Sequence, residues 1–270
     1  MVKGTALVTG ASSGIGAAYA RRLAHEGYNV VLHGRRRELL REICDSLVKE
    51  HGIRAEFVCA ELGDPEGIRS IEETIARIPD LTFLVNNAGS STIEPFHEET
   101  VESQEEMIRV HALAAVRFAH AALATMVPRR AGTIVNVASV AAFVVAPGSA
   151  VYCAVKGFLV SFSESLHLEL GGSGIRVQAL CPGFTRSDFH GRLGYAVNER
   201  FFRGFLTAEE VVEASLRDLE RGKIVSIPRL KYKITAVVPR LLPRPIFYRI
   251  VGLYRRRQQK HRETWFPPKA

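Results

Sequence analysis

A tyrosine and a lysine four residues apart, Tyr152 and Lys156, form the most chemically suggestive pair in this sequence. On a helix this spacing places both side chains on one face. A phenol with its reference pKa of about 10 exchanges protons poorly at neutral pH, and a neighbouring ammonium should favour the phenolate and lower that pKa. Ser139 follows an apolar run and could hydrogen-bond a substrate oxygen. Together the three residues predict a site for general acid–base chemistry.

A glycine-rich turn near the N-terminus indicates a nucleotide-binding site. Residues 9–16 read TGASSGIG, between a strand-like run and a helix-like run. Gly10 permits a tight reversal, Gly14 lets the backbone approach a pyrophosphate, and Gly16 lets the helix pack closely. The free N–H groups at the start of the helix attract phosphates, although a turn without any ligand is the alternative explanation. We expect cofactor contacts from Gly10, Ser12, Ser13, Gly14, Ile15 and Gly16.

The residues after the second strand-like run bear on the choice of dinucleotide. A carboxylate there would bond the ribose 2′-hydroxyl of NAD, whereas an arginine accommodates the 2′-phosphate of NADP. The sequence reads HGRRR over residues 33–37 and has no acid before Glu38. Arg35 and Arg36 can each hold a phosphate with two donors, so we expect NADP(H), with Arg35 the stronger candidate. A solvated basic start to the next helix is the alternative.

The elements that must position these residues alternate between short β-branched runs and longer runs of helical period. The expected strands are Thr5–Thr9, Asn29–His33, Arg54–Cys59, Leu81–Val85, Thr133–Ala138, Arg176–Leu180 and Lys223–Ile227. The expected helices are Ile15–Glu26, Arg37–Glu50, Pro65–Arg77, Val101–Met126, Val151–Leu170 and Ala208–Arg221. This alternation predicts an α/β fold, a single doubly wound domain with a seven-stranded parallel sheet and helices on both faces.

The composition is typical of an intracellular globular protein. The chain has 270 residues, of which 47% are hydrophobic and 24% charged, which suits one large α/β domain and argues against general disorder. The four cysteines form no C-x-x-C pair and have no histidine at metal spacing, so we expect neither disulfides nor a metal site. The N-terminus lacks the pattern of a signal peptide, and we expect a cytoplasmic location.

The net charge of +8 is concentrated at one end, since residues 221–270 hold 14 lysines and arginines against one acid, Glu263. We divide the chain into a catalytic domain, residues 1–230, and a basic amphipathic C-terminal tail, residues 231–270. The uncharged runs of the tail are far shorter than the ~20 residues of a membrane-spanning helix. Peripheral contact of residues 231–262 with an anionic membrane competes with a solvated basic helix packed on the body or on a second subunit. Nucleic acid is disfavoured because no binding module surrounds the charge.

Five motifs in order resemble those of the short-chain dehydrogenase/reductase family over roughly residues 3–228. They are the turn at residues 9–16, NNAG at 86–89, Ser139, YCAVK at 152–156, and Pro182-Gly183 followed by Thr185. The resemblance implies a Rossmann domain that interconverts a carbonyl and a secondary alcohol, with a nicotinamide cofactor as the hydride carrier. It also implies a homodimer or homotetramer formed through the helices expected at 101–126 and 151–170.

The resemblance further implies a role for each matching residue. Tyr152 would be the general acid/base, Lys156 would bind the nicotinamide ribose and lower the Tyr152 pKa, and Ser139 would orient the carbonyl. The cofactor would be lined on its adenosine side by Asn87, Ala88 and Gly89, and on its nicotinamide side by Pro182, Gly183 and Thr185.

Two positions depart from the family pattern. Where members usually carry an Asn that holds a relay water, this chain has His111. The imidazole titrates near neutral pH and could replace the relay, or it could merely fill the site while backbone holds the water. Where an Asp usually contacts the adenine, the chain has Glu61-Leu62, which keeps a carboxylate on a longer arm and should weaken that contact.

The segment that corresponds to the family's substrate flap is rich in aromatic rings, namely Phe184, Phe189, Tyr195, Phe201, Phe202 and Phe205. An apolar lid would favour a lipophilic small-molecule carbonyl, such as a 3-oxoacyl, steroid-like or polyketide-like compound, but the rings could instead only anchor the flap. The main rival function is a non-catalytic NADP(H)-binding sensor or scaffold, although a sensor has no need of the whole Ser-Tyr-Lys set. An epimerase or dehydratase is disfavoured, because such relatives tend to be longer, with a separate substrate domain.

Overall fold

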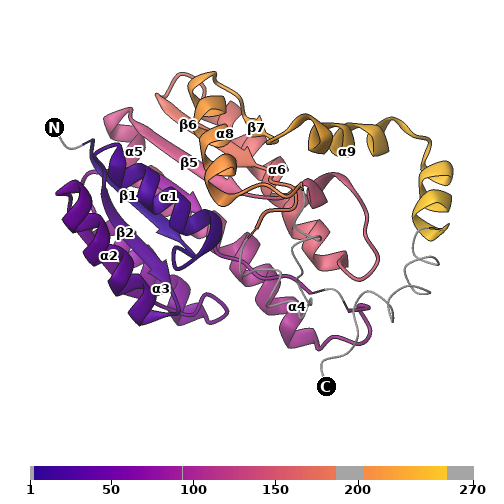
Figure 1. Ribbon diagram of the computed structural model, residues 1–270, viewed down its shortest axis with the longest axis horizontal. Helices are drawn as coiled ribbons and strands as arrows, with labels where there is room; N and C mark the ends of the chain where they lie inside the picture. The colour runs from indigo at the N-terminus through magenta and orange to yellow at the C-terminus, as the bar shows by residue number, and fades with distance from the viewer. Residues whose placement is uncertain (1–2, 93, 187–203, 254–270) are drawn as a thin grey trace.

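The computed structural model describes residues 3–92, 94–186 and 204–253. Seven parallel strands form one sheet in the order β3-β2-β1-β4-β5-β6-β7 (Figure 1). The strands are β1 (Thr5–Thr9), β2 (Asn29–Gly34), β3 (Ala55–Cys59), β4 (Leu81–Asn86), β5 (Gly132–Val137), β6 (Ile175–Leu180) and β7 (Val225–Ser226). The order reverses between β1 and β4, and sheets of this kind bind ligands beyond the carboxyl ends of the strands at that point. The expected doubly wound fold is confirmed.

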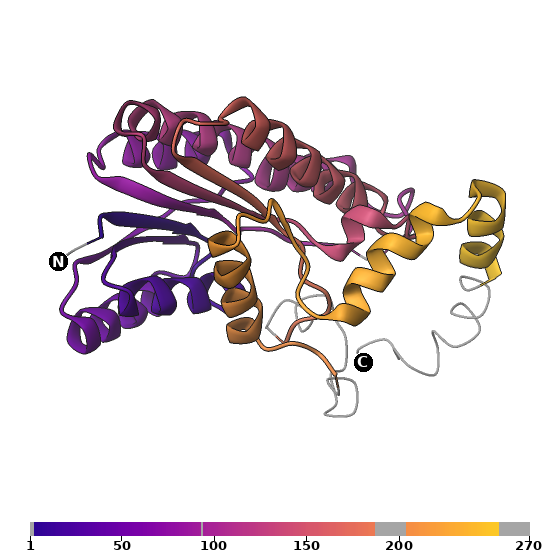
Figure 2. The ribbon, with the colours of Figure 1, turned by 90° about the horizontal axis from the view of Figure 1, so that it is seen from above.

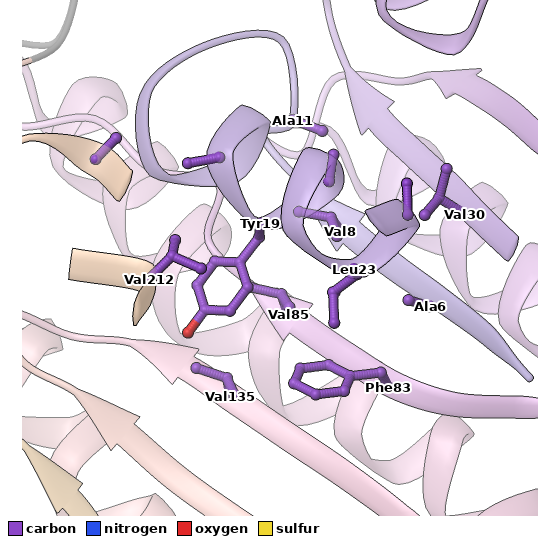
Figure 3. Close-up of a cluster of buried hydrophobic side chains, with 14 of the residues drawn as sticks. Ala6, Val8, Ala11, Tyr19, Leu23, Val30, Phe83, Val85, Val135 and Val212 are labelled. Carbon is purple, nitrogen blue, oxygen red and sulfur yellow. The ribbon is translucent and has the colours of Figure 1, made fainter. Parts of the chain in front are cut away.

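Helices cover both faces of the sheet (Figure 2). One face carries α1 (Gly14–His25), α2 (Arg37–His51) and α8 (Ala208–Glu220), and the other carries α3 (Pro65–Ala76), α5 (Ala114–Arg129) and α6 (Ala150–Glu169). On the first face, the buried Tyr19 and Leu23 of α1 lie over Phe83 and Val85 of β4 (Figure 3). Burial of apolar surface on both faces, at about 25 cal/mol per Å², holds the strands and therefore their carboxyl ends in place.

The long helix expected over residues 101–126 is interrupted. A first helix, α4 (Val101–Ile108), leads into a π-helical turn, η1 (Arg109–Leu113), and α5 begins only after it. The stretch Val101–Arg129 is long and apolar enough to cross a membrane, but α5 packs on α3, β4 and β5 as a core helix. Single π-helical turns are rare and frequently lie at functional sites, and this one contains His111.

The ends of several elements follow from single residues. Gly52 ends α2 with a φ of +64°, as a left-handed C-terminal residue should. Thr207 and Glu210 form the expected capping box at the start of α8. The fifth strand begins and ends one residue earlier than expected, since β5 runs from Gly132 to Val137, and Ser139 caps the 3-10 helix η2 (Val140–Phe143).

The C-terminal part of the described chain is helical rather than irregular. Helix α9 (Leu230–Leu241) contains Pro239 in its last turn, and residues 244–253 form further helical turns (yellow in Figure 1). Tyr232 and Ala236 of α9 are buried, and the helix packs on η2. The sequence had suggested a break here because prolines interrupt the pattern, but Pro239 is the tenth of the twelve residues of α9, and the helix ends two residues after it. The division of the chain at residue 230 stays a prediction.

Candidate active site

The glycine turn has the backbone that its sequence predicts. Gly10 and Gly14 have φ angles of +66° and +56°, which residues with side chains rarely adopt. A Cβ on Gly16 would collide with the carbonyl oxygen of Gly10. Ser13 precedes α1 in an extended conformation, so the free N–H groups of the first helical turn open toward the glycine turn. The result is a cradle of bare backbone that a pyrophosphate can approach.

The NNAG motif fastens the end of β4 to this turn. The Asn87 side-chain amide donates to the carbonyl oxygens of Thr9 at 2.8 Å and Gly10 at 3.2 Å. The Thr9 hydroxyl accepts the backbone N–H groups of Asn87 and Ala88. A Cβ on Gly10 would lie 2.9 Å from the Cα of Ala88. The two loops at the strand-order reversal are therefore held at backbone contact.

The two candidate arginines lie in different surroundings. Arg35 pairs with the Glu61 carboxylate at 3.0 Å, and both side chains are more than a third exposed (58% and 40%). Arg36 donates to the side-chain and backbone oxygens of Ser12 at 3.1–3.2 Å, so it lies directly on the glycine turn. Glu61 thus competes with any phosphate for Arg35. The Leu62 side chain is packed in the core, so only its backbone could contact a cofactor.

Tyr152, which is predicted to transfer a proton, and Ser139, which is predicted to orient the carbonyl, lie next to each other. Burial raises the pKa of Tyr152 to about 12, and the nearby Ser139 hydroxyl has a smaller effect in the opposite direction. The Ser139 oxygen also accepts the Ala141 N–H at 3.1 Å, which fixes its direction. Both hydroxyls therefore converge just beyond the carboxyl end of β5.

Lys156 lies on the same face of α6 but differs from expectation in its electrostatics. Its side chain is buried, its Nζ donates to the Val137 carbonyl oxygen at 2.7 Å, and the Nζ lies 5.6 Å from the Tyr152 ring centroid. Burial lowers the pKa of Lys156 to about 7. The pKa of Tyr152 is raised in this cofactor-free geometry and not lowered as expected. Burial of the phenol outweighs the neighbour.

His111 completes the group from the π-helical turn. Its buried ring meets the Tyr152 ring edge-on at 5.9 Å between centroids. Its Nε2 lies 2.8 Å from the Ser90 carbonyl oxygen, and its Nδ1 is buried with no hydrogen-bond partner among the described residues. Burial and then the nearby Lys156 hold the pKa of His111 well below its usual value, so the ring is neutral. A Cβ on Gly89 would collide with this ring, which explains the glycine there.

The loop after β6 approaches the same place. The Pro182 carbonyl oxygen accepts the N–H of Val140, the residue after Ser139, at 3.0 Å, and the Thr185 hydroxyl donates to the Gly183 carbonyl oxygen at 3.0 Å. Phe184 stacks on Phe205 with 5.1 Å between ring centroids. The other aromatic residues of the expected flap, Phe189, Tyr195, Phe201 and Phe202, lie outside the described residues.

Two further residues near the site were not anticipated from the sequence. Ser90 holds the His111 ring through its backbone, which no side-chain pattern could have revealed. The Tyr232 ring of α9 lies against Gly183, and its hydroxyl donates to the Phe184 carbonyl oxygen at 3.3 Å. The only feature of the sequence that could have pointed to Tyr232 is that it is an aromatic residue in a basic segment. In the described part of the chain, no group of acidic, histidine or cysteine side chains could hold a metal ion.

This donor set fits a dinucleotide. Gly10 and Gly16 leave no room for a Cβ against Ala88 and the Gly10 carbonyl oxygen, so the turn is packed as tightly as the glycine pattern of a dinucleotide-binding turn requires. The Ser139, Tyr152 and Lys156 group lies at the carboxyl edge of the same sheet, beside the loop that carries Gly183. The arrangement separates a phosphate-binding end from a proton-transferring end, as a bound hydride carrier and a small substrate would need.

The comparisons with known proteins agree with this geometry. The profile of the short chain dehydrogenase family matches residues 4–197. An NADP-dependent 3-hydroxy acid dehydrogenase of Escherichia coli is 36% identical over 219 residues, which cover 77% of this chain and 86% of that protein. The chain therefore belongs to the short-chain dehydrogenase/reductase family. It is an oxidoreductase of the class that acts between alcohols and carbonyls with a nicotinamide cofactor.

Solved structures give the same result. A short-chain dehydrogenase from Sphingobium yanoikuyae in complex with NADPH has a TM-score of 0.79 at 36% identity and covers 84% of this chain and 88% of its own. A bulky-bulky ketone specific alcohol dehydrogenase from Comamonas testosteroni has a TM-score of 0.75 at 30% identity and covers 99% and 97%. The second similarity extends over nearly the whole chain, the basic segment included.

Proposed function

We propose that this protein is an NADP(H)-dependent reductase or dehydrogenase that interconverts a lipophilic carbonyl compound and its secondary alcohol. The observation that carries the proposal is the juxtaposition of Ser139, Tyr152 and Lys156 at the sheet edge that the glycine turn opens onto. A phosphate-binding protein without chemistry has no use for a phenol with a serine hydroxyl and a buried lysine beside it.

The residues divide the work by their positions. A bound nicotinamide supplies or accepts the hydride. The Tyr152 phenol donates its proton to the carbonyl oxygen during reduction and recovers it during oxidation. The Ser139 hydroxyl holds that oxygen in line, since it already points at the phenol. Lys156, fixed by the Val137 carbonyl oxygen, holds the ribose and passes protons toward the phenol.

His111 acts as a neutral relay rather than as filler. The Ser90 N–H and the Ser90 carbonyl oxygen both face Nε2, at 3.1 Å and 2.8 Å. In the tautomer that we propose, the proton is on Nε2, which donates to the carbonyl oxygen, and Nδ1 is a buried acceptor with no partner in the described structure. Lys156 lies close enough to depress the His111 pKa. A buried acceptor next to a buried lysine is suited to receive a proton or a bridging water. The π-helical turn is what brings this ring to the site.

The NADP(H) preference rests on the two arginines and the lack of an acid before Glu38. Arg36 lies on the glycine turn, and Arg35 becomes available when a phosphate outcompetes Glu61. The carboxylate of Glu61 and the backbone of Leu62 line the adenine side, as do Asn87, Ala88 and Gly89. The similar proteins from Escherichia coli and Sphingobium yanoikuyae, NADP-dependent and NADPH-bound respectively, support the same preference.

A lipophilic substrate is favoured by aromatic surface at the loop after β6. Phe184 is 56% exposed although it stacks on Phe205, so an apolar ring faces outward beside the Gly183 loop. Apolar contact area of this kind recruits apolar ligands. The similarity to a bulky-bulky ketone specific enzyme supports a large ketone over a sugar.

The test is the loss of NADPH absorbance with a panel of bulky ketones and 3-oxoacyl thioesters, wild type beside Tyr152→Phe. We expect turnover by the wild type and a loss of about 10²- to 10⁴-fold in the variant, the usual worth of a general acid. A wild type that binds NADPH but reduces nothing would favour the rival function, a sensor or scaffold.

Assembly and location complete the proposal. We expect a homodimer or homotetramer, because α4, α5 and α6 expose large apolar side chains, among them Val101 (62%) and Leu168 (74%). We also expect the protein to lie in the cytoplasm.

In addition, α9 exposes Leu230, Ile234 and Leu241 opposite its buried Tyr232. No acidic residue occurs between residues 229 and 253, so this face suits peripheral contact with an anionic membrane.

A further inference from the structure

Helix α9 lies against both loops that frame the proton-transferring end of the site. It packs on η2, the short helix that begins at Ser139. Its Tyr232 ring covers Gly183 so closely that a Cβ there would collide with it, and the Tyr232 hydroxyl donates to the Phe184 carbonyl oxygen at 3.3 Å. One buried side chain therefore holds the loop after β6, while its helix supports the loop after β5.

The start of α9 is fixed by a strained residue. Arg229 has a φ of +69°, a left-handed value that residues with side chains rarely adopt. Its guanidinium donates to the Gly204 carbonyl oxygen at 3.1 Å and pairs with Glu210 of α8 at 3.3 Å. Lys231 reaches the same carbonyl oxygen, and its Nζ lies 4.6 Å from the Tyr232 ring centroid. A strained backbone persists only where surrounding contacts hold it in place. Here the contacts of Arg229 and Lys231 hold the start of α9, and they therefore fix the position of Tyr232.

We propose that α9 is a wall of the active site and that Tyr232 is a positioning residue, which sets the backbone of residues 182–185 through its ring on Gly183 and its hydroxyl on Phe184. The inference rests on the proposed function, because it takes that backbone to face the nicotinamide and the substrate. It assigns a role to the first part of the basic segment that its charge does not suggest. The same helix then offers one face to the site and the other to solvent.

The contact itself is tested without any activity, by thermal unfolding of Gly183→Ala, Tyr232→Ala and the double variant. A Cβ at residue 183 meets the Tyr232 ring and nothing nearer, so the added methyl should do no harm once the ring is gone. We expect the double variant to unfold no earlier than Tyr232→Ala alone. Losses of melting temperature that simply add would overturn the contact.

The positioning role is tested by kinetics on the full chain. We expect Tyr232→Ala to weaken NADPH binding severalfold and to lower kcat/KM for a ketone at least tenfold, with the pH profile unchanged because Tyr152 and Lys156 are untouched. Tyr232→Phe keeps the ring on Gly183 and should recover most of the loss. Val237→Ala, at an exposed position of α9, is the matched control and should equal the wild type.

The outcomes separate the two proposals. A folded Tyr232→Ala protein with wild-type NADPH affinity and kcat/KM would overturn the positioning role and leave the reaction intact. A wild type that neither binds NADPH nor reduces any ketone would overturn the proposed function, while the unfolding experiment would still decide whether the contact exists.

Discussion

The His111 ring lies edge-on to the Tyr152 ring, with 5.9 Å between the centroids and an angle of 87° between the planes. The two residues come from different helices, α6 and the π-helical turn before α5. Their contact links the glycine turn to the proton-transferring phenol, because Gly89 beneath His111 belongs to the motif that is fastened to Gly10. The groups proposed to bind phosphate and to transfer the proton are therefore joined by one continuous set of contacts.

His111→Asn should remove an acid sensitivity of the fold. The folded protein holds His111 neutral with its pKa well below 6.5, whereas the unfolded chain binds a proton as pH falls through about 6.5. The wild type should therefore lose stability from about pH 7 to about pH 5, by at most about 1.4 kcal/mol per pH unit from this residue. Urea unfolding of both proteins across that range measures the difference. Parallel curves would contradict a neutral, buried imidazole.

Ser139→Ala should move the pH profile of alcohol oxidation to higher pH. The Ser139 hydroxyl lowers the pKa of Tyr152 against the larger effect of burial, so its removal raises that pKa further and the phenolate becomes scarcer at any given pH. We expect kcat/KM to fall by about 10²-fold, at the lower end for general acid–base catalysis. Ser139→Thr keeps a hydroxyl and serves as the control. The limb of the profile along which activity rises with pH reports the Tyr152 pKa. If this limb lies at the same pH in the alanine variant and the wild type, the contact is refuted.

Lys156→Met should abolish a rise of stability with pH. The pKa of Lys156 falls from its ordinary 10.5 to about 7 on burial. Between these values the unfolded chain binds the proton that the folded protein has released, so the cofactor-free wild type becomes more stable as pH rises from about 7 to about 9. The methionine variant keeps the apolar stem and cannot titrate. Equal pH slopes in urea unfolding would mean that the buried lysine keeps its ordinary pKa.

Arg35→Ala and Arg36→Ala should each reduce the NADPH/NADH selectivity ratio, by about tenfold or more if a charge-assisted hydrogen bond to phosphate is lost. Glu61→Gln releases Arg35 from its ion pair and should raise the NADPH/NADH selectivity ratio, because the change at the adenine side is the same for both cofactors. Arg37→Ala, whose guanidinium lies over the Phe57 ring, is the control. The ratio of kcat/KM for the two cofactors is the measurement, and an unchanged ratio in both alanine variants would exclude these arginines.

Substitution of Leu230, Ile234 and Leu241 by serine should weaken association with anionic vesicles. These side chains are 72%, 53% and 78% exposed, and apolar insertion must accompany the attraction of the basic residues for stable binding. Co-sedimentation with vesicles of phosphatidylserine and phosphatidylcholine measures it, with pure phosphatidylcholine as the control. Equal pelleting of wild type and variant, or none by either, would remove the membrane contact.

Local patterns in the sequence determined much of this protein. The seven strands, the glycine turn, the capping box at Thr207 and the pairing of Tyr152 with Lys156 on one helical face all follow from spacings within a few residues. Such spacings express backbone geometry, which is the same in any protein, and parallel strands bring their carboxyl ends to one edge wherever they occur. The family and the position of the site were therefore predictable.

Only the tertiary structure decided the electrostatics and the partners. The pKa values of Tyr152 and Lys156 depend on burial by distant segments, and this reversed the shift that adjacency alone had suggested. The π-helical turn at His111 and the Tyr232 ring on Gly183 join residues 22 and 49 positions apart, contacts that leave no periodic trace in the chain. Desolvation and long-range packing are properties of the folded interior, so no local pattern can encode their balance.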